Sequence, residues 1–328
     1  MRAAVVFEHG DVDRIRLEAD FPEPELEPGW VRVAVRACAL NFHDIASRRG
    51  MPGITLPLPL VTGSDVAGEV AALGAGVTGV RIGERVLIDP FYLPRGMIGE
   101  RWHGGRAEFC AAHASQLVPI PDGLDFASAA SIPLAYATAH RMMVTRAGVG
   151  SADTVLILGA SGGVGTAALQ LAKRAGARVI ACASSAEKLA RLRELGADFA
   201  LDYVARDMRE AVWEIAGKPR ITGQGGVDLV VNCTGGGTWR DSIRCLRRGG
   251  RLVTCGEEQV DVRYVWTFEH SLLGSNGWQR GDITAMLGYA ADGSLRPVID
   301  RLLPLEQVHE AERLMESRSL FGKIVLQP

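Results

Sequence analysis

The stretch LILGASGGVGTAALQLAKRAGARVIACASSAEK, residues 156–188, decides the fold. It opens on a continuous apolar run, which is typical of a strand buried on both faces. Glycines follow at once, and then a run of small residues that ends in Lys173, Arg174 and Gly176, the signals of a helix end. A second apolar run, 177–183, predicts the next strand. Strand, glycine turn, helix and strand in this order predict one unit of a parallel sheet.

The glycine turn predicts a phosphate-binding site. Ala160, Gly162 and Gly165 stand at the three spaced positions of the dinucleotide fingerprint. Gly162 lets the backbone approach a pyrophosphate, Gly165 lets the helix pack closely on the sheet, and the helix N-terminus supplies free N–H groups. The alternative is a turn that only packs a helix on a strand. We expect a dinucleotide to contact Ala160, Ser161, Gly162, Gly163, Val164 and Gly165.

The end of the second strand favours NADP(H) over NAD. A carboxylate there would accept a hydrogen bond from the ribose 2′-hydroxyl of NAD, but Ala183 occupies the place. Ser184, Ser185 and Lys188 follow, and Tyr203 can reach the same corner. Hydroxyl groups and an ammonium suit a 2′-phosphate, and we expect no carboxylate at this corner to repel one. The alternative is that the serines cap a helix and Lys188 is an ordinary solvated lysine.

The rest of the chain extends this pattern. The first 120 residues or so read as short strands bounded by glycine. From Phe126 onward helices and strands alternate through six strands, the last at 271–276, which predicts a doubly wound parallel sheet. One more helix, 305–317, and a terminal strand follow. The fold class is therefore α/β, with a β-rich domain beside a Rossmann sheet.

Composition removes several classes of protein. With 328 residues the chain is long enough for two domains, and its net charge of −2 gives no sign of nucleic acid or of an anionic membrane. The amino terminus turns polar too early for a signal peptide, and no run of 18 apolar residues occurs. The six cysteines lie far apart in sequence, which argues against a disulfide framework. We expect a cytoplasmic protein.

Several stretches together resemble the medium-chain dehydrogenase/reductase superfamily, and the resemblance covers essentially the whole chain. They are ACALNFHD (37–44), VTGSDVAGEV (61–70), GGRAEF (104–109), GASGGVG (159–165) and FGKIVL (321–326). The resemblance implies a GroES-like catalytic domain from residues 1–124 and 278–328, and a Rossmann NADP(H)-binding domain from 125–277. It also implies a cleft where the nicotinamide meets substrate, and a homodimer.

The zinc positions of that superfamily hold unsuitable residues. They correspond to Asn41, Ser64 and Leu134, none of which is a useful zinc ligand. The segment 90–105, in place of the structural-zinc lobe, has no cysteine. We expect no metal; a variant site built on other cysteines and histidines is the alternative.

Asn41 and Asp44 resemble the Asn-x-x-Asp signature of the zinc-free quinone and enoyl reductases. These enzymes use NADPH to reduce quinones or carbon–carbon double bonds conjugated to a carbonyl. The resemblance therefore implies an oxidoreductase acting on a small apolar quinone, enone or enoyl substrate. The alternatives are an alcohol or carbonyl dehydrogenase that lacks its zinc, and a coenzyme-binding protein without catalysis.

Hydride addition to such an acceptor needs a hydrogen-bond donor at the carbonyl oxygen and a later proton. Asn41 is the predicted donor, with a helix cap as its alternative. Tyr92 is the first candidate for the proton, ahead of His43 and Tyr136, with a purely packing role as its alternative. By resemblance, Thr138 faces the nicotinamide.

Three further residues are expected at the coenzyme. Cys233 and Thr234 follow a predicted strand, and ligands bind beyond the carboxyl ends of such strands. Lys323 resembles in position a family residue that approaches the coenzyme phosphates, and its charge suits that role. A solvated surface lysine is the alternative for Lys323.

Overall fold

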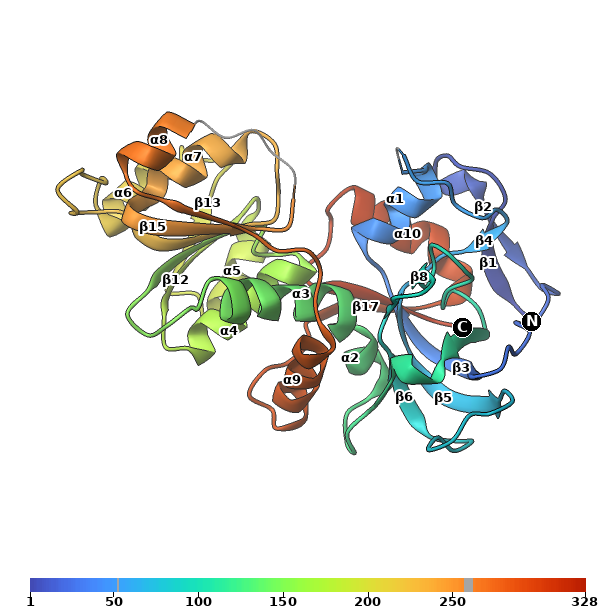
Figure 1. The fold of residues 1–328 in the computed structure, drawn as a ribbon. Coiled ribbons are helices and arrows are strands. Elements are labelled where there is room, and N and C mark those ends of the chain that lie inside the picture. Colours follow the sequence, from blue (N-terminus) through green and yellow to red (C-terminus); the bar gives the residue numbers. More distant parts are fainter. Residues whose placement is uncertain (52, 257–261) are drawn as a thin grey trace. The chain divides into compact units, whose positions relative to one another are not determined.

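The computed structural model describes residues 1–51, 53–256 and 262–328 and divides into two compact units (Figure 1). The terminal unit joins Met1–Leu134 to Ile283–Pro328, and the inserted unit is Ala135–Asp282. The boundaries expected from the sequence, after residues 124 and 277, lie ten and five residues earlier than those of the structure, which follow Leu134 and Asp282.

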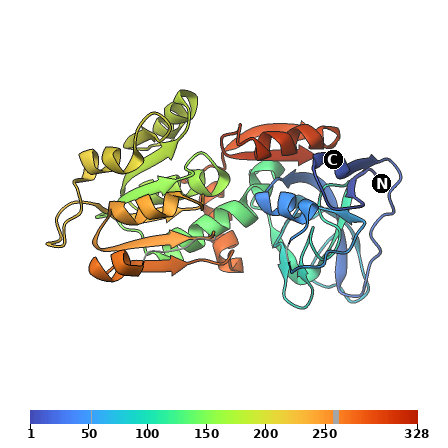
Figure 2. The same ribbon diagram turned by 90° about the horizontal axis from the view of Figure 1, so that it is seen from above.

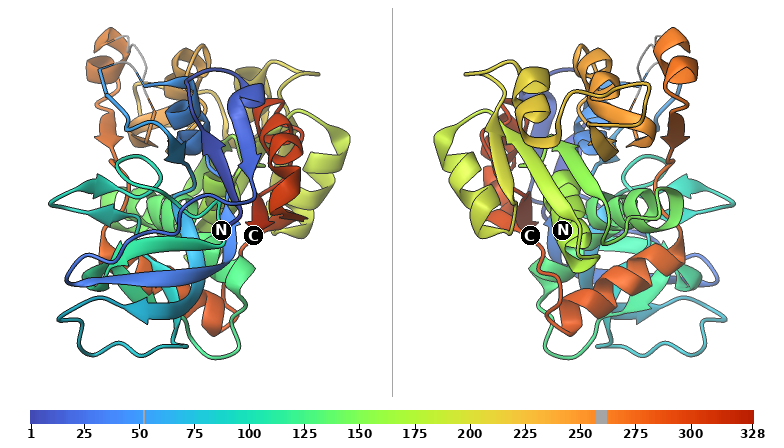
Figure 3. Two further views of the ribbon diagram at one scale, coloured as in Figure 1. Left: turned by 90° about the vertical axis from the view of Figure 1, so that its right-hand side faces the viewer. Right: turned by 90° about the vertical axis from the view of Figure 1, so that its left-hand side faces the viewer.

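The largest sheet of the terminal unit brings the last strand of the chain beside the strand that leads to Asn41. Its order is β10-β6-β5-β3-β18-β17, and β9 also pairs with β3. The strands are β3 (Trp30–Ala39), β5 (Asp65–Leu73), β6 (Arg85–Ile88), β9 (Phe109–His113), β10 (Leu117–Pro119), β17 (Ile299–Pro304) and β18 (Lys323–Gln327). In the antiparallel pair of β18 with β3, Leu326 lies opposite Cys38. Both chain ends belong to this unit (Figure 3).

Smaller elements complete the terminal unit. They are the sheet β2-β1-β4 (Ile15–Glu18, Ala3–Val6, Leu60–Val61) and the hairpin β7–β8 (Phe91–Tyr92, Gly96–Met97). The helices are α1 (Phe42–Arg49), α2 (Phe126–Ala130), α10 (Val308–Glu316) and α9 (Arg280–Ala291), which begins in the inserted unit, and the 3₁₀ turns are η1 (Val12–Arg14), η2 (Ala114–Gln116) and η5 (Leu305–Gln307). The sequence analysis missed α9 and β17. It also began the last helix at Leu305, where η5 precedes α10.

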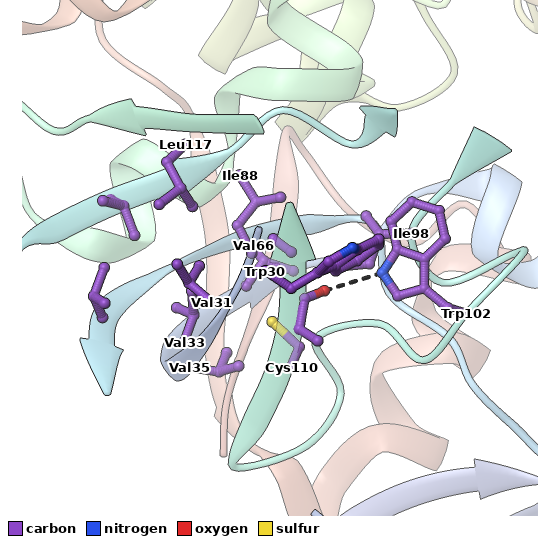
Figure 4. Packing of buried hydrophobic residues seen from close by; sticks show 14 of the residues in the cluster. Trp30, Val31, Val33, Val35, Val66, Ile88, Ile98, Trp102, Cys110 and Leu117 are labelled. Carbon is purple, nitrogen blue, oxygen red and sulfur yellow. Dashed lines mark hydrogen bonds between the residues drawn. The ribbon is translucent and has the colours of Figure 1, made fainter. Parts of the chain in front are cut away.

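The core of the terminal unit is built around two tryptophans (Figure 4). The rings of Trp30 and Trp102 meet edge to face with their centroids 5.6 Å apart. The indole nitrogen of Trp102 donates to the Ala111 carbonyl oxygen at 3.0 Å, which satisfies the one polar atom of that buried side chain. Valines of β3 and β5 face this core, as the alternating pattern predicts, and Ile88 and Ile98 pack in the same cluster.

The inserted unit contains the parallel sheet that the sequence predicts. Its order is β13-β12-β11-β14-β15-β16, and every neighbouring pair is parallel. The strands are β11 (Thr154–Leu158), β12 (Arg178–Ala183), β13 (Phe199–Asp202), β14 (Val227–Asn232), β15 (Leu246–Thr254) and β16 (Ser271–Gly274). β11, the first of these strands along the chain, lies in the middle of the sheet, and later strands are added on both sides of it. The sheet is therefore doubly wound.

Helices cover both faces of this sheet (Figures 1 and 2). They are α4 (Gly163–Arg174) and α5 (Ala186–Glu194) on one face, and α6 (Met208–Ala216), α7 (Thr238–Cys245) and α8 (Val262–Thr267) on the other. Leu156 and Leu158 of β11 pack with Val212 and Ile243 on the second face. No helix in the described part of the chain is long and apolar enough to cross a membrane.

The helical content expected at 129–144 is broken into pieces. After α2, the segments Ile132–Tyr136 and Arg141–Arg146 are π-helical, and α3 (Ala137–His140) lies between them. Pro133 has no N–H group to donate to a regular helical turn, which explains part of the irregularity.

Candidate functional site

The glycine turn of the inserted unit lies between β11 and α4, as predicted. β11 ends at Leu158, Gly162 is the N-cap residue, and α4 begins at Gly163. A Cβ atom on Gly165 would come within 2.2 Å of the Gly159 carbonyl oxygen. Only glycine therefore lets α4 pack this closely on the turn, which agrees with the packing role predicted for Gly165.

Gly162 differs from Gly165 in its surroundings. A Cβ atom on Gly162 would approach only the Gly159 carbonyl oxygen, at 3.5 Å, which is an ordinary contact. Packing within the chain therefore does not require glycine here, whereas close approach of a ligand would. The first N–H groups of α4 have no partner inside the helix and lie at its positive end. The turn, with Ala160, Ser161, Gly162, Gly163 and Val164, fits a pyrophosphate.

The corner after β12 gathers the residues expected at a 2′-phosphate. The Ser185 hydroxyl accepts a hydrogen bond from the Lys188 backbone N–H at 3.3 Å and caps α5. The Tyr203 N–H donates to the Ala183 carbonyl oxygen at 3.3 Å, and the side chain of Tyr203 is exposed. Ser184, between them, is also exposed. Three hydroxyl-bearing residues and Lys188 therefore belong to the segments that end β12 and β13 at one edge of the sheet.

Asp202 also lies at this corner, contrary to the expectation that no carboxylate does. It is the register partner of Ala183 on the neighbouring parallel strand. Its Oδ1 accepts hydrogen bonds from the N–H groups of Val204 at 2.9 Å and Ala205 at 3.1 Å. The carboxylate is thus held by the turn after β13. The sequence signal was available, since parallel strands end at the same edge and the predicted strand FALDY contains this aspartate.

The loop after β14 adjoins the glycine turn. A Cβ atom on Gly159 would lie 2.7 Å from Thr234 Cγ2, so the two loops touch. The Asn232 side chain fixes this loop by accepting from the Thr234 N–H at 3.0 Å and from its hydroxyl at 2.9 Å. Cys233, between them, is partly exposed. Both predicted residues therefore lie at the carboxyl edge of the sheet.

Tyr136 and Thr138 belong to the inserted unit and are buried. The Tyr136 hydroxyl lies 3.3 Å from the Thr166 hydroxyl of α4. Since the Tyr136 side chain is fully buried and holds α4, it is a packing residue rather than a proton donor. Thr138, two residues after Tyr136, is 5% exposed.

Lys323 does not occupy the position expected of a phosphate ligand. Its side chain is 2% exposed, and its ammonium donates to the Leu40 carbonyl oxygen at 2.7 Å, to Asn41 Oδ1 at 2.5 Å and to Asp65 Oδ2 at 3.2 Å. An ammonium has three N–H groups, and all three are used inside the terminal unit. The alternative, that Lys323 is a solvated surface lysine, is also wrong.

Asp65 is the acid at the centre of this cluster. Burial raises its pKa, and the charge of Lys323 and a hydrogen bond from Asn41 only partly offset that effect. Its Oδ1 accepts from the Leu134 N–H at 2.9 Å, at the end of the first segment of the unit. One polar cluster therefore joins residues that are far apart in sequence: Asn41, Asp65, Leu134 and Lys323.

A network of ion pairs supports this polar cluster. Glu312 of α10 accepts from Arg48 Nε at 2.6 Å and also pairs with Arg106, and all three side chains are buried. Arg106 lies 3.5 Å from Asp44, whose carboxylate accepts from the Asn41 N–H at 2.8 Å. Burial raises the pKa of Glu312, but Arg106 and Arg48 more than offset this and hold it below its ordinary value. The sequence analysis missed this network.

The three zinc positions do not fit zinc. Asn41 Oδ1 already accepts from the Lys323 ammonium, and the Ser64 hydroxyl donates to Asp44 at 3.0 Å. Leu134 offers no side-chain ligand at all. Among the described residues, no group of three or more histidine, cysteine, aspartate or glutamate side chains is arranged to hold a metal ion.

Tyr92 lies elsewhere than the sequence analysis expected. Its ring stacks on His113 at 4.5 Å and meets Trp30 at 5.7 Å, at the start of β3. Asn41 follows the other end of that strand, which spans roughly 30 Å at about 3.3 Å per residue. The structure therefore does not bring Tyr92 to Asn41, and the proton-donor assignment is corrected. His43 does lie near Asn41, with its Nε2 3.2 Å from Glu100 Oε2.

Comparison with known proteins gives the same family from both units. The family model for an alcohol dehydrogenase GroES-like domain matches residues 27–122, and that for a zinc-binding dehydrogenase matches 163–292. An NADPH-dependent alkenal/one oxidoreductase of Arabidopsis thaliana is 32% identical over all of this chain and 80% of its own. The human quinone oxidoreductase is 29% identical over 99% of this chain and 97% of its own.

Among solved structures, one described as an NAD-dependent alcohol dehydrogenase shares 37% identity with a TM-score of 0.92, over all of both chains. A quinone oxidoreductase from Coxiella burnetii shares 28% identity with a TM-score of 0.85, over all of this chain and 99% of its own. The chain therefore belongs to the medium-chain dehydrogenase/reductase superfamily of oxidoreductases, in the branch that holds the quinone oxidoreductases and alkenal reductases.

Proposed function

We propose that this oxidoreductase uses NADPH to reduce quinones or carbon–carbon double bonds conjugated to a carbonyl group. One observation carries the proposal: at the zinc positions the chain has an amide, a hydroxyl and a leucine, with the Lys323 ammonium 2.5 Å from Asn41 Oδ1. Chemistry on a zinc-bound alkoxide has no ligand set here. Reduction of a conjugated acceptor needs only placement and a hydrogen-bond donor.

Asn41 is the donor that we propose for the acceptor oxygen. Bound NADPH supplies the hydride, and negative charge then develops on that oxygen. Lys323 fixes the amide by binding its oxygen, and a hydrogen bond to one side of an amide strengthens the donor on the other. One Asn41 N–H faces the Ala39 carbonyl oxygen at 3.5 Å, at the long limit of a hydrogen bond. The other amide N–H bonds to Asp65, so the N–H at Ala39 is the donor available to a substrate oxygen.

His43 is the residue that we propose as the proton donor, in place of Tyr92. His43 follows Asn41 by two residues and lies in the first turn of α1. Its side chain is 30% exposed to solvent, whereas that of Tyr136 is fully buried. Glu100 lies 3.2 Å from its Nε2 and can orient the ring. An imidazole N–H can donate a proton to the substrate and be reprotonated from solvent, as a general acid must.

The coenzyme preference rests on the corner after β12. The adenosine ribose is expected beside the segments that follow β12 and β13. These segments carry Ser184, Ser185, Lys188 and Tyr203, whose hydroxyl and ammonium groups suit a 2′-phosphate. Asp202 lies nearby, but two backbone N–H groups already bind its carboxylate. The NADPH-dependent relative from Arabidopsis thaliana supports the same preference.

The second candidate function is that of an alcohol or carbonyl dehydrogenase. The solved structure with 37% identity carries the description NAD-dependent alcohol dehydrogenase, and this favours it. The ligand set at Asn41, Ser64 and Leu134 argues against the zinc-dependent form of that chemistry.

One substrate separates these two candidates. A conjugated enal offers both a double bond and an aldehyde, so incubation with NADPH followed by product analysis reports which bond is reduced. We expect the saturated aldehyde. The allylic alcohol as sole product would overturn the proposal and favour the dehydrogenase.

We further propose a homodimer and a cytoplasmic location. β16 is the last strand in the order of its sheet, so its outer edge is open to the same strand of a second copy. All six cysteines are free thiols, as a reducing compartment favours. A monomer in sedimentation equilibrium would rule out the homodimer. Cell fractionation tests the cytoplasmic location.

A further inference from the structure

Two cysteines that are distant in sequence meet at the carboxyl edge of the inserted unit. Cys233 follows β14 and Cys255 follows β15, directly after the register pair Asn232 and Thr254 of these parallel strands. Neighbouring strands are about 4.8 Å apart, and the Cα atoms of a disulfide are about 4.4–6.8 Å apart. The two side chains are close enough that each shifts the pKa of the other. This geometry needs only a small movement to form a bond.

The pair also differs from the other thiols in reactivity. The hydrogen bond from Cys233 lowers the pKa of Cys255 below its ordinary value, whereas the same contact and burial raise that of Cys233. Cys255 is exposed and Cys233 partly so. Burial instead raises the pKa of Cys110 and Cys182 to about 12. Thiolates are the reactive form, so Cys255 is the nucleophile and Cys233 the neighbouring thiol that completes the bond.

We propose that Cys233 and Cys255 form a reversible disulfide with a hydroperoxide as the oxidant. The Cys255 thiolate attacks one peroxide oxygen, the O–O bond breaks, and an alcohol or water leaves with a proton from solvent. Cys255 is then a sulfenic acid. The Cys233 thiol attacks its sulfur, an S–S bond forms, and water leaves. The two thiols lose two electrons in all, and the peroxide gains them; an added dithiol reverses the reaction.

The disulfide acts on the coenzyme edge, a consequence that rests on the proposed NADP(H) site. Thr234 touches the glycine turn at Gly159, and Gly235 and Gly236 adopt the left-handed conformations φ +66° and +61°. A bond from Cys233 to Cys255 draws this loop toward β15 and fixes it. The loop can then no longer adjust to a ligand at the glycine turn, and NADP⁺ binds severalfold more weakly.

The test treats the purified full chain with hydrogen peroxide, blocks free thiols, digests without reductant and identifies linked peptides by mass spectrometry. We expect a 233–255 linkage, loss of two of the six free thiols, and recovery with dithiothreitol. Cys255→Ser should abolish the linkage, whereas Cys182→Ser, a buried thiol of β12, should leave it intact. Absence of the linkage in the wild-type chain, or persistence of peroxide-induced loss of two thiols in Cys255→Ser, overturns the proposal.

A second arm measures NADP⁺ binding by calorimetry before and after oxidation. We expect weaker binding by the oxidised wild type and unchanged binding by peroxide-treated Cys255→Ser. Equal affinities of oxidised and reduced wild type would overturn the effect on the coenzyme. A linkage that forms in a chain whose reduced state does not bind NADP⁺ would instead contradict the proposed function and leave the disulfide standing.

Discussion

The two units hold their candidate sites in different ways. In the inserted unit the site is mostly backbone: the consecutive residues 160–165 and the loops that end neighbouring strands. In the terminal unit it is a set of buried charges, where Lys323 reaches Asn41 and Asp65 across 282 and 258 residues of sequence. The first arrangement depends on the absence of side chains at glycine. The second depends on every buried charge having its partner.

This difference predicts where each unit is vulnerable. Loss of a partner in the terminal unit leaves an uncompensated charge in the interior, which costs folding free energy. A small side chain in the glycine turn instead displaces either the helix or the ligand, depending on its position.

The largest effect is expected for Glu312→Gln. Glu312 is fully buried between Arg48 and Arg106, so its loss as an anion leaves two buried guanidinium groups short of a partner. We expect a loss of about 3–5 kcal/mol in unfolding free energy, measured by urea titration. Glu306→Gln is the matched control, because its pair with Arg2 is exposed and should contribute little to stability. Equal effects of both variants would show that burial does not set the value of these pairs.

The contribution of Glu312 to stability depends on pH. The folded state lowers the pKa of Glu312 below its ordinary value of 4.5, so its stabilising contribution is present above that value and disappears as the pH falls through the folded pKa. The gap in stability between wild type and Glu312→Gln should therefore narrow in acid below pH 4.5. A gap that widens there would reverse the assigned sign.

The next largest effect separates His43 from Tyr92. His43→Gln should lower kcat on an enone by about 10²-fold if the imidazole supplies the proton. Tyr92→Phe keeps the ring that stacks on His113 and should leave kcat nearly unchanged. Steady-state kinetics of both variants with the same enone decides between the two residues. The opposite ranking would restore Tyr92 as the donor.

The glycine turn offers a matched pair of substitutions. Gly165→Ala places a methyl group 2.2 Å from a carbonyl oxygen and should cost about 1–3 kcal/mol of stability. Gly162→Ala meets nothing closer than 3.5 Å and should cost within about 0.5 kcal/mol. Since we propose that the pyrophosphate approaches the backbone at Gly162, Gly162→Ala should still weaken NADP⁺ binding in calorimetry. Unchanged binding would place the pyrophosphate elsewhere.

The smallest effect concerns coenzyme choice. Lys188→Ala should lower the preference for NADPH over NADH by about 1 kcal/mol, roughly fivefold in kcat/KM, without changing turnover with NADH. Lys218→Ala, an exposed lysine that packs on Trp213 in the same unit, should change neither. A similar loss with both coenzymes would mean that Lys188 does not distinguish them.

Sequence reasoning succeeded where the signal was local. The six strands and the turn at 159–165 could be predicted because each has its own pattern of apolar residues and glycines. The roles of Lys323 and Tyr92 could not, since burial depends on partners that only folding brings near. Asp202 lies between these cases: its strand was predicted, but its register beside Ala183 was not considered.

The most direct test of the account follows NADPH and NADH oxidation side by side, with metal-depleted protein and a small enone as acceptor. We predict faster turnover with NADPH and no requirement for added zinc. Turnover only with NADH would contradict the assignment of the corner at Ala183. Turnover only after zinc is added would contradict the zinc-free chemistry at Asn41.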